Sequence, residues 1–63
     1  MTRMELERRR SGLSQTELAR AVNVSQTAIS KLERRAHKKL SAQVRKAVEE
    51  YFNESLEDLL AAA

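Results

Sequence analysis

The sequence predicts an all-α fold, a compact bundle of five short helices in which a tight turn joins the second helix to the third. Three observations carry this prediction. Proline is absent, glycine occurs once, and most residues are good helix formers. Apolar residues recur at helical spacing in several short segments. A serine or threonine precedes each segment, where its side-chain oxygen can cap the first turn of a helix.

The first predicted helix runs from Arg3 to Ser11. Thr2 and Glu5 begin it as a capping box, in which each side chain bonds to the backbone amide of the other residue. This helix has only two hydrophobic residues, Met4 and Leu6. One arginine of the run Arg8–Arg10 must therefore face inward or pack the aliphatic part of its side chain against the core. Gly12 ends the helix in the left-handed conformation that glycine tolerates.

The second predicted helix runs from Gln15 to Val22 and begins with a further capping box, formed by Ser14 and Glu17. Asn23 follows, and asparagine enters the left-handed conformation more readily than other non-glycine residues. Ser25 then caps a third helix, from Gln26 to Arg34. The buried face of this helix consists of Ala28, Ile29 and Leu32. Its outer face consists of Gln26, Thr27, Ser30 and Lys31.

Ser41 caps the fourth predicted helix, Ala42 to Phe52, and Asn53 ends it. Its core-facing stripe at helical spacing is Val44, Ala47, Val48, Tyr51 and Phe52. Ser55 begins a fifth helix, whose apolar face is Leu56, Leu59 and Leu60. The final segment, Ala61 to Ala63, has no apolar period and is expected to fray.

The length of 63 residues predicts a single domain over residues 1–63. With no cysteine and one histidine, His37, the chain is expected to hold no metal, no cofactor and no small-molecule ligand. It has no phosphate-cradling glycine loop, and its carboxylate pairs are adjacent and point apart, so it is not expected to be an enzyme. It lacks an apolar run of the ~20 residues that span a membrane and a signal-peptide pattern. We therefore expect a soluble cytoplasmic protein that is not associated with a membrane.

Charge is distributed unevenly along the chain. All twelve lysines and arginines lie between Arg3 and Lys46 together with four glutamates, which gives this segment a net charge of +8. From Ala47 onward there are five acidic residues and no basic one, a net charge of −5. A basic body with an acidic tail favours a polyanionic partner. Charge alone is equally consistent with an ordinary solvated surface.

Three motifs occur in a fixed order: G-L-S-Q-x-E-L-A from Gly12 to Ala19, V-S-Q-x-x-I-S-x-L-E from Val24 to Glu33, and S-L-E-D-L-L from Ser55 to Leu60. With this order and spacing, the chain from about Glu7 to Leu60 resembles the phage repressor and Cro-like (lambda repressor-type) helix-turn-helix family. The resemblance implies a five-helix fold and double-stranded DNA as the partner. Two departures are Asn23, where the family usually has glycine, and Arg35 with further basic residues in a loop that is usually shorter.

The resemblance implies that the helix over residues 26–34 enters the major groove and reads bases. The expected base contacts are Gln26, Thr27, Ser30 and Lys31. Glutamine offers a donor and an acceptor that match adenine N7 and N6, and Thr27 offers a methyl group for thymine. Lys31 can donate to guanine O6 or N7, or to a phosphate. Taken without the motif, these residues are also typical of an ordinary polar surface.

Phosphate contacts are implied for residues around this helix. Gln15 lies at the start of its helix, where free amides and the helix dipole favour an anion. Such contacts fix register without reading sequence. The expected set is Gln15, Ser25, Arg10, Arg34, Arg35, Lys38 and Lys39.

Arg8 and Glu33 match positions that form a buried or half-buried ion pair in several members of the family, so we expect a structural pair rather than two independent surface charges. The function implied is that of a small transcriptional repressor or regulator, which would be associated with the nucleoid. A homodimer on a palindromic operator is expected, joined through the acidic C-terminal region, where Leu59 or Leu60 can close the interface. The alternative is a protein-interaction module of the same fold, antitoxin-like, without independent DNA binding.

Overall fold

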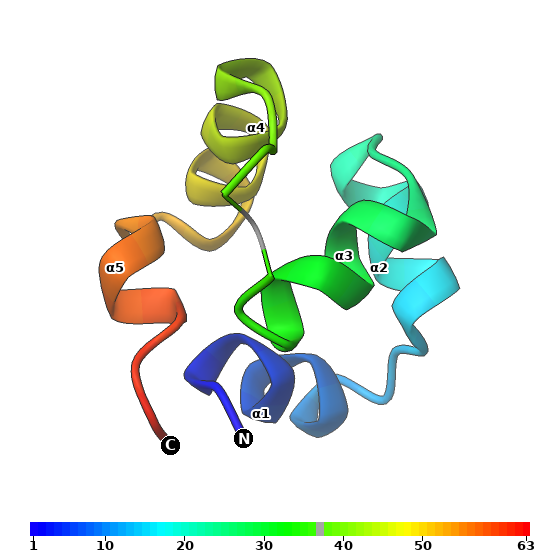
Figure 1. Cartoon of the computed structure of the whole chain (residues 1–63). Coiled ribbons are helices and arrows are strands. Elements are labelled where there is room, and N and C mark those ends of the chain that lie inside the picture. The colour runs from blue at the N-terminus through cyan, green and yellow to red at the C-terminus, as the bar shows by residue number, and fades with distance from the viewer. Residues whose placement is uncertain (37) are drawn as a thin grey trace.

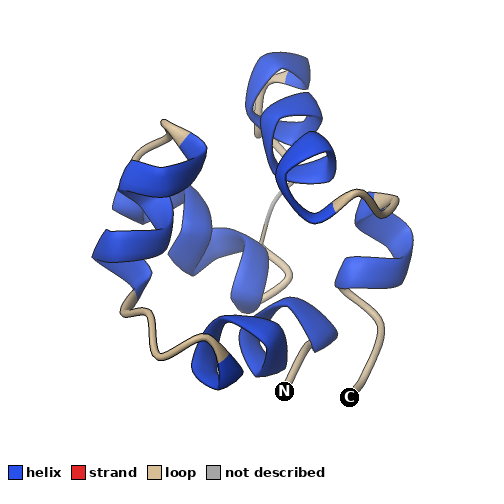
Figure 2. Ribbon diagram, turned by 180° about the vertical axis from the view of Figure 1, so that it is seen from behind, coloured by secondary structure: helices blue, strands red, loops and turns tan. Residues whose placement is uncertain are grey.

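The computed structural model describes residues 1–36 and 38–63, so the expectation for His37 lies outside the described residues. Five helices follow one another along the chain (Figure 1). Their bounds are α1 Arg3–Arg10, α2 Gln15–Val22, α3 Gln26–Glu33, α4 Ala42–Phe52 and α5 Leu56–Leu59. Loops and turns connect them (Figure 2). The prediction of an all-α fold of five short helices is confirmed.

One cluster of apolar side chains forms the core, and every helix contributes to it. The side chains with no exposed surface include Met4, Leu18, Ile29, Leu32, Val48 and Leu59. The pair α2 and α3 shares the most extensive packing. Ala19 is only 3% exposed, and its small side chain allows the two helices to approach closely. No helix of the described residues is long and apolar enough to cross a membrane.

All five helices begin at the predicted caps. The side-chain oxygens of Thr2, Ser14, Ser25, Ser41 and Ser55 each accept a hydrogen bond from the backbone amide three residues later. At α2 the capping box is complete, because the Ser14 amide also donates to Glu17 Oε1 at 2.9 Å. At α1 the Glu5 carboxylate pairs instead with Arg9, whose Nη2 lies 2.6 Å from Glu5 Oε2.

The capping box of α2 makes stability depend on pH. The bonds from the Ser14 amide and hydroxyl lower the pKa of Glu17 below its ordinary value of 4.5. A carboxyl whose pKa is depressed by folding contributes stability above its unfolded pKa, and this contribution is lost as pH falls through the folded value. We therefore expect Glu17→Gln to flatten the acid side of the stability profile, measured by urea unfolding between about pH 3 and 7. Glu57→Gln, at an exposed position of α5, is the matched control. Parallel profiles for wild type and Glu17→Gln would contradict the expectation.

The helices α1, α2 and α4 are each terminated by the left-handed residue that the sequence predicts. Gly12, Asn23 and Asn53 have φ of 72°, 67° and 55°. Two predicted helices are one residue too long, because Ser11 and Arg34 are C-caps rather than helical residues. Such end positions are the least defined part of any helix.

The prediction that Ala61–Ala63 frays is wrong. The Arg3 amide donates to the Ala61 carbonyl at 2.9 Å, and the Ala63 amide donates to the Met1 carbonyl at 2.9 Å. Thr2 and Ala62 thereby form an antiparallel β-bridge that joins the two termini. The two ends of the chain accordingly lie close together in Figure 1. Backbone pairing needs no apolar side chain, so apolar periodicity does not reveal it.

Two expectations for apolar side chains are also wrong. Tyr51 was predicted to face the core but is 47% exposed, with its ring packed edge-on against Phe52 at a centroid distance of 5.1 Å. It lies at the margin of the α4 stripe, where a phenol can keep its hydroxyl in water. Leu59 and Leu60, expected to be free for a dimer interface, are 0% and 9% exposed. The short α5 uses both to close the core.

Candidate nucleic-acid interface

The turn between α2 and α3 sets the direction in which α3 leaves. Asn23, in the left-handed conformation, donates to the Arg20 carbonyl at 3.2 Å, and Val24 donates to the Ala19 carbonyl at 2.9 Å. These two bonds are the pattern that terminates a helix around a left-handed residue. Ser25 follows at once and caps α3 through the Ala28 amide at 3.1 Å. The α2–turn–α3 unit is therefore fixed by local hydrogen bonds as well as by packing.

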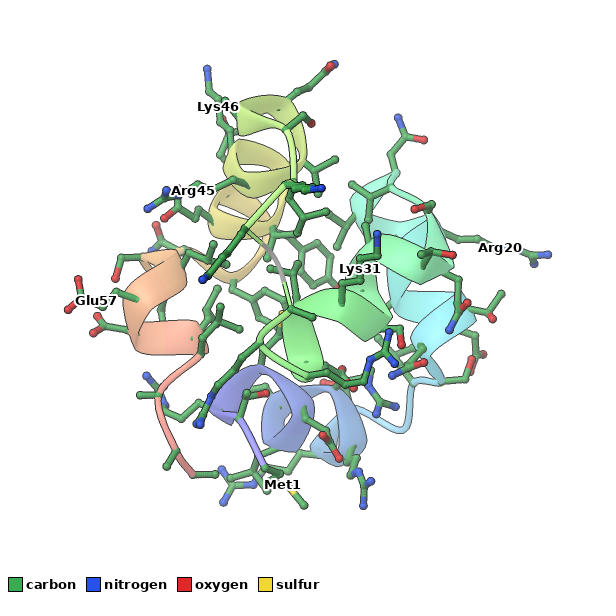
Figure 3. All side chains as sticks on the ribbon, viewed as in Figure 1. Met1, Arg20, Lys31, Arg45, Lys46 and Glu57 are labelled. Atoms are coloured by element: carbon green, nitrogen blue, oxygen red, sulfur yellow. The ribbon has the colours of Figure 1, made fainter. Side chains whose placement is uncertain are left out.

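The two faces of α3 differ sharply. Ala28, Ile29 and Leu32 are between 0% and 4% exposed and hold the helix against the core. Gln26, Thr27 and Lys31 are exposed on the opposite side, and Ser30 is half-buried between the two faces. Figure 3 shows Lys31 extending outward from α3. The four residues expected to contact bases thus share the side of α3 that the core leaves open.

The structure brings Arg8 and Glu33 together beneath α3. Arg8 Nε and Nη2 donate to the two Glu33 oxygens at 2.6 Å and 3.1 Å, and Arg8 Nη1 donates to the Leu13 carbonyl at 2.9 Å. The two side chains are 11% and 3% exposed. The hydrogen bonds to Glu33 raise the pKa of Arg8 above its ordinary value. This geometry is a two-point, charge-assisted ion pair, in which all three guanidinium nitrogens are used.

Two glutamine side chains extend this ion pair to the surface. Gln15 Nε2 donates to Glu33 Oε1 at 3.0 Å, and Gln26 Nε2 donates to Gln15 Oε1 at 2.7 Å. Sequence reasoning assigned Gln15 to phosphate and Gln26 to bases, and it missed the bond between them. Sequence position was the one signal that could have indicated this bond. Gln15 and Gln26 are the first residues of α2 and α3, and Glu33 is the last residue of α3.

The twelve basic residues divide into two groups. Six form ion pairs with nearby acids: Arg3, Arg8, Arg9, Arg10, Arg45 and Lys46. Within residues 1–36 and 38–63, the other six take part in no ion pair: Arg20, Lys31, Arg34, Arg35, Lys38 and Lys39. Five of these six lie on α3 or in the segment after it. Most of the positive charge without an ion-pair partner in this part of the chain therefore lies on α3 and in the segment that follows it.

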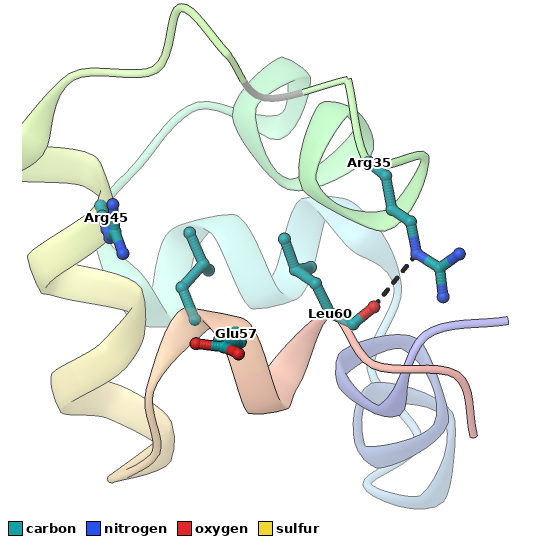
Figure 4. A pocket seen from close by; sticks show the side chains of 5 residues that line it. Arg35, Arg45, Glu57 and Leu60 are labelled. Carbon is teal, nitrogen blue, oxygen red and sulfur yellow. Dashed lines mark hydrogen bonds between the residues drawn. The ribbon is translucent and has the colours of Figure 1, made fainter.

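Arg35 differs from the other residues that follow α3. It has a positive φ of 59°, and its amide and that of Ala36 donate to the carbonyls of Leu32 and Lys31, which ends α3. Its Nε donates to the Leu60 carbonyl at 3.1 Å (Figure 4). The side chain therefore reaches α5, beside a pocket whose other lining residues are Arg45, Leu56, Glu57 and Leu60.

The remaining residues expected at phosphates lie at the surface. Arg10 pairs weakly with Glu7 at 3.7 Å, and Arg34 Nε donates to the Ser30 carbonyl of its own helix at 3.4 Å. Lys38 and Lys39 are exposed. Ser25 uses its oxygen as the α3 cap, which leaves its hydroxyl proton free to donate.

Comparison with known proteins identifies the family. A family model described as helix-turn-helix matches residues 4–59, from the first turn of α1 to the last residue of α5. Comparisons with curated proteins and with solved structures each gave no match. The resemblance carried by the three sequence motifs is thereby confirmed. The chain belongs to the lambda repressor/Cro-like helix-turn-helix family, whose members bind double-stranded DNA as transcription regulators.

Proposed function

We propose that this chain is a sequence-specific DNA-binding repressor that places α3 in the major groove. Gln26, Thr27, Ser30 and Lys31 contact base edges. Phosphates are contacted by the residues around α3, namely Gln15, Ser25, Arg10, Arg34, Arg35, Lys38 and Lys39. The observation that carries the proposal is the exposed polar face of α3, together with five basic residues on α3 and in the segment after it that have no ion-pair partner in the described part of the chain. Polar side chains on such a helix can form hydrogen bonds with base edges, and nearby basic side chains can bind the DNA phosphates.

The repressor acts as a homodimer, because one module with four base contacts binds DNA weakly. We place the contact between the two protomers in the C-terminal region. Glu50, Glu57 and Asp58 are exposed there, and the DNA phosphates would repel them, so this region faces away from DNA. Leu59 and Leu60 are buried, so the interface uses other side chains of α4 and α5. Tyr51, 47% exposed on α4, offers the aromatic surface that interfaces favour.

Selection of bound sites from random duplexes, followed by a salt titration on the selected site, tests this function. We expect a palindrome with half-sites about 34–36 Å apart. Five of the proposed phosphate residues are cationic, so log K should fall with log salt at a slope of up to about −4.5 per protomer. No duplex binding at ~50 mM salt would refute the proposal. Equal binding of selected and random duplexes would indicate an architectural protein instead.

A further inference from the structure

Arg35 follows α3 in a backbone conformation that suits glycine or asparagine better than arginine. The Arg35 amide donates to the Leu32 carbonyl at 3.0 Å and the Ala36 amide to the Lys31 carbonyl at 2.8 Å. This pair of bonds is a Schellman motif, which needs a left-handed residue at its centre. Gly12 fills that place after α1 with a φ of 72°, whereas Arg35 fills it after α3 with a φ of 59°. A side chain makes this conformation unfavourable, and such strain persists where surrounding contacts hold the residue in place.

The Arg35 side chain makes such a contact at the C-terminal end of α5. Its Nε donates to the Leu60 carbonyl at 3.1 Å (Figure 4). That carbonyl is a fixed point, because the Leu60 side chain is buried and the next carbonyl, of Ala61, accepts from the Arg3 amide at 2.9 Å. Carbonyls at the end of a helix lack a donor within the helix and carry the negative end of its dipole, so they attract a cation. The bond therefore holds the guanidinium group of Arg35 against α5.

This anchor uses only the Nε–H of the guanidinium group. Within residues 1–36 and 38–63, Nη1 and Nη2 of Arg35 donate to no acceptor, and the side chain has no acidic partner. Figure 4 shows these two terminal nitrogens pointing away from the pocket. Arg35 is exposed, as are its neighbour Arg34 and the nearby Lys38 and Lys39. A planar guanidinium group whose two terminal nitrogens are unoccupied can bind a phosphate through both of them.

We propose that Arg35 binds a DNA phosphate through Nη1 and Nη2 while its Nε holds the Leu60 carbonyl, so that α5 positions a phosphate-binding side chain. The inference rests on the proposed function, in which Arg35 is one of the phosphate contacts. Because both interactions use the same planar group, each one fixes the orientation that the other needs. Binding of DNA and packing of the end of α5 therefore strengthen each other, and this coupling is reciprocal.

Arg35→Lys tests the positioning, because it keeps the charge and removes the planar group. We expect its affinity for a random-sequence duplex to fall roughly tenfold, about the effect of losing one hydrogen bond to a charged group. The slope of log K against log salt should stay the same, because the charge is retained. Arg34→Lys is the matched control, since Arg34 is also exposed and its Nε donates to the Ser30 carbonyl of its own helix. It should change the affinity little, and equal losses in the two variants would overturn the inference.

Amide hydrogen exchange measures the anchor in the free protein. The amides of Ala61 and Ala63 donate to carbonyls at the end of α5 and at the N-terminus of the chain. Relative to the amides of α2, they should exchange faster in Arg35→Lys than in wild type, and at the wild-type rate in Arg34→Lys. The random-sequence duplex should slow their exchange more in wild type than in Arg35→Lys, because the coupling is reciprocal.

Arg35→Gly is a second variant that should fold, because glycine accepts the left-handed conformation without strain. It removes the anchor and the charge, so we expect the same faster exchange and a salt slope smaller by about 0.9. Unchanged exchange of Ala61 and Ala63 in both Arg35 variants would refute positioning by α5. Failure of wild type to bind any duplex refutes the proposed function and with it the phosphate contact. Exchange in the free protein still decides whether Arg35 holds α5.

Discussion

Arg8→Ala is expected to destabilise the fold by about 3–5 kcal/mol, because it leaves the Glu33 carboxylate buried without its cation. Glu33 is 3% exposed on its side chain, and Arg8 is its only charged partner within the described residues. Domains hold roughly 0.05–0.15 kcal/mol of stability per residue, or about 3–9 kcal/mol for a chain of this length. The variant should therefore lose at least about a third of the free energy of unfolding. Urea denaturation followed by circular dichroism measures the effect.

Arg9→Ala is the control, since Arg9 is the next residue on the same helix and its side chain is 60% exposed. Its ion pair with Glu5 spans one helical turn, and such pairs contribute at most about 0.5 kcal/mol. A similar small loss in both variants would show that Arg8 and Glu33 act as ordinary surface charges. The double variant Arg8→Met with Glu33→Met should recover much of the loss, because no unpaired charge then remains in the interior.

The sequence was sufficient wherever structure is decided locally. Helix caps at Ser14 and Ser25 and the left-handed turn at Asn23 depend on residues within a few positions, and the structure has each of them as predicted. The family motif added the pairing of Arg8 with Glu33, which lie 25 residues apart. The side-chain roles at DNA remain predictions.

What the sequence did not reveal depends on contacts between distant segments. The bridge of Thr2 with Ala62 is made by backbone groups, which leave no trace in residue type. The bond from Arg35 to the Leu60 carbonyl depends on how the segment after α3 meets α5. The bond between Gln15 and Gln26 depends on the angle between two helices. Each needs tertiary geometry that periodicity does not contain.

Ion pairing also changes the meaning of the charge count. The segment from Arg3 to Lys46 carries +8, and the run Arg8–Arg10 is its densest part. In the structure each of these three arginines pairs with a glutamate, and the Arg8 side chain is only 11% exposed. The charge available to a polyanion therefore lies less at α1 than at Lys31 and in the segment after α3. In the sequence, basic residues lie both before α2 and after α3. In the structure, those before α2 pair with glutamates, whereas most of those after α3 do not.

Gln26→Ala is expected to weaken binding to the selected duplex by about 1–3 kcal/mol, roughly 5- to 150-fold, while binding to a scrambled duplex changes little. The physical reason is that Gln26 offers its donor and acceptor to a base edge, which only the correct base satisfies. Gln26 is exposed, so its loss should not unfold the chain. Fluorescence anisotropy with the two duplexes at one salt concentration measures the difference.

Lys38→Ala is the counterpart, because Lys38 is equally exposed but contributes a point charge without a base pattern. It should weaken binding to both duplexes alike and reduce the salt slope by about one. The comparison distinguishes base recognition from electrostatic binding. Loss of a base contact changes the ratio of the affinities for the two duplexes, whereas loss of a phosphate contact lowers both affinities and leaves their ratio constant. If the two variants lose affinity for both duplexes in the same proportion, Gln26 does not read a base and α3 is not the recognition helix.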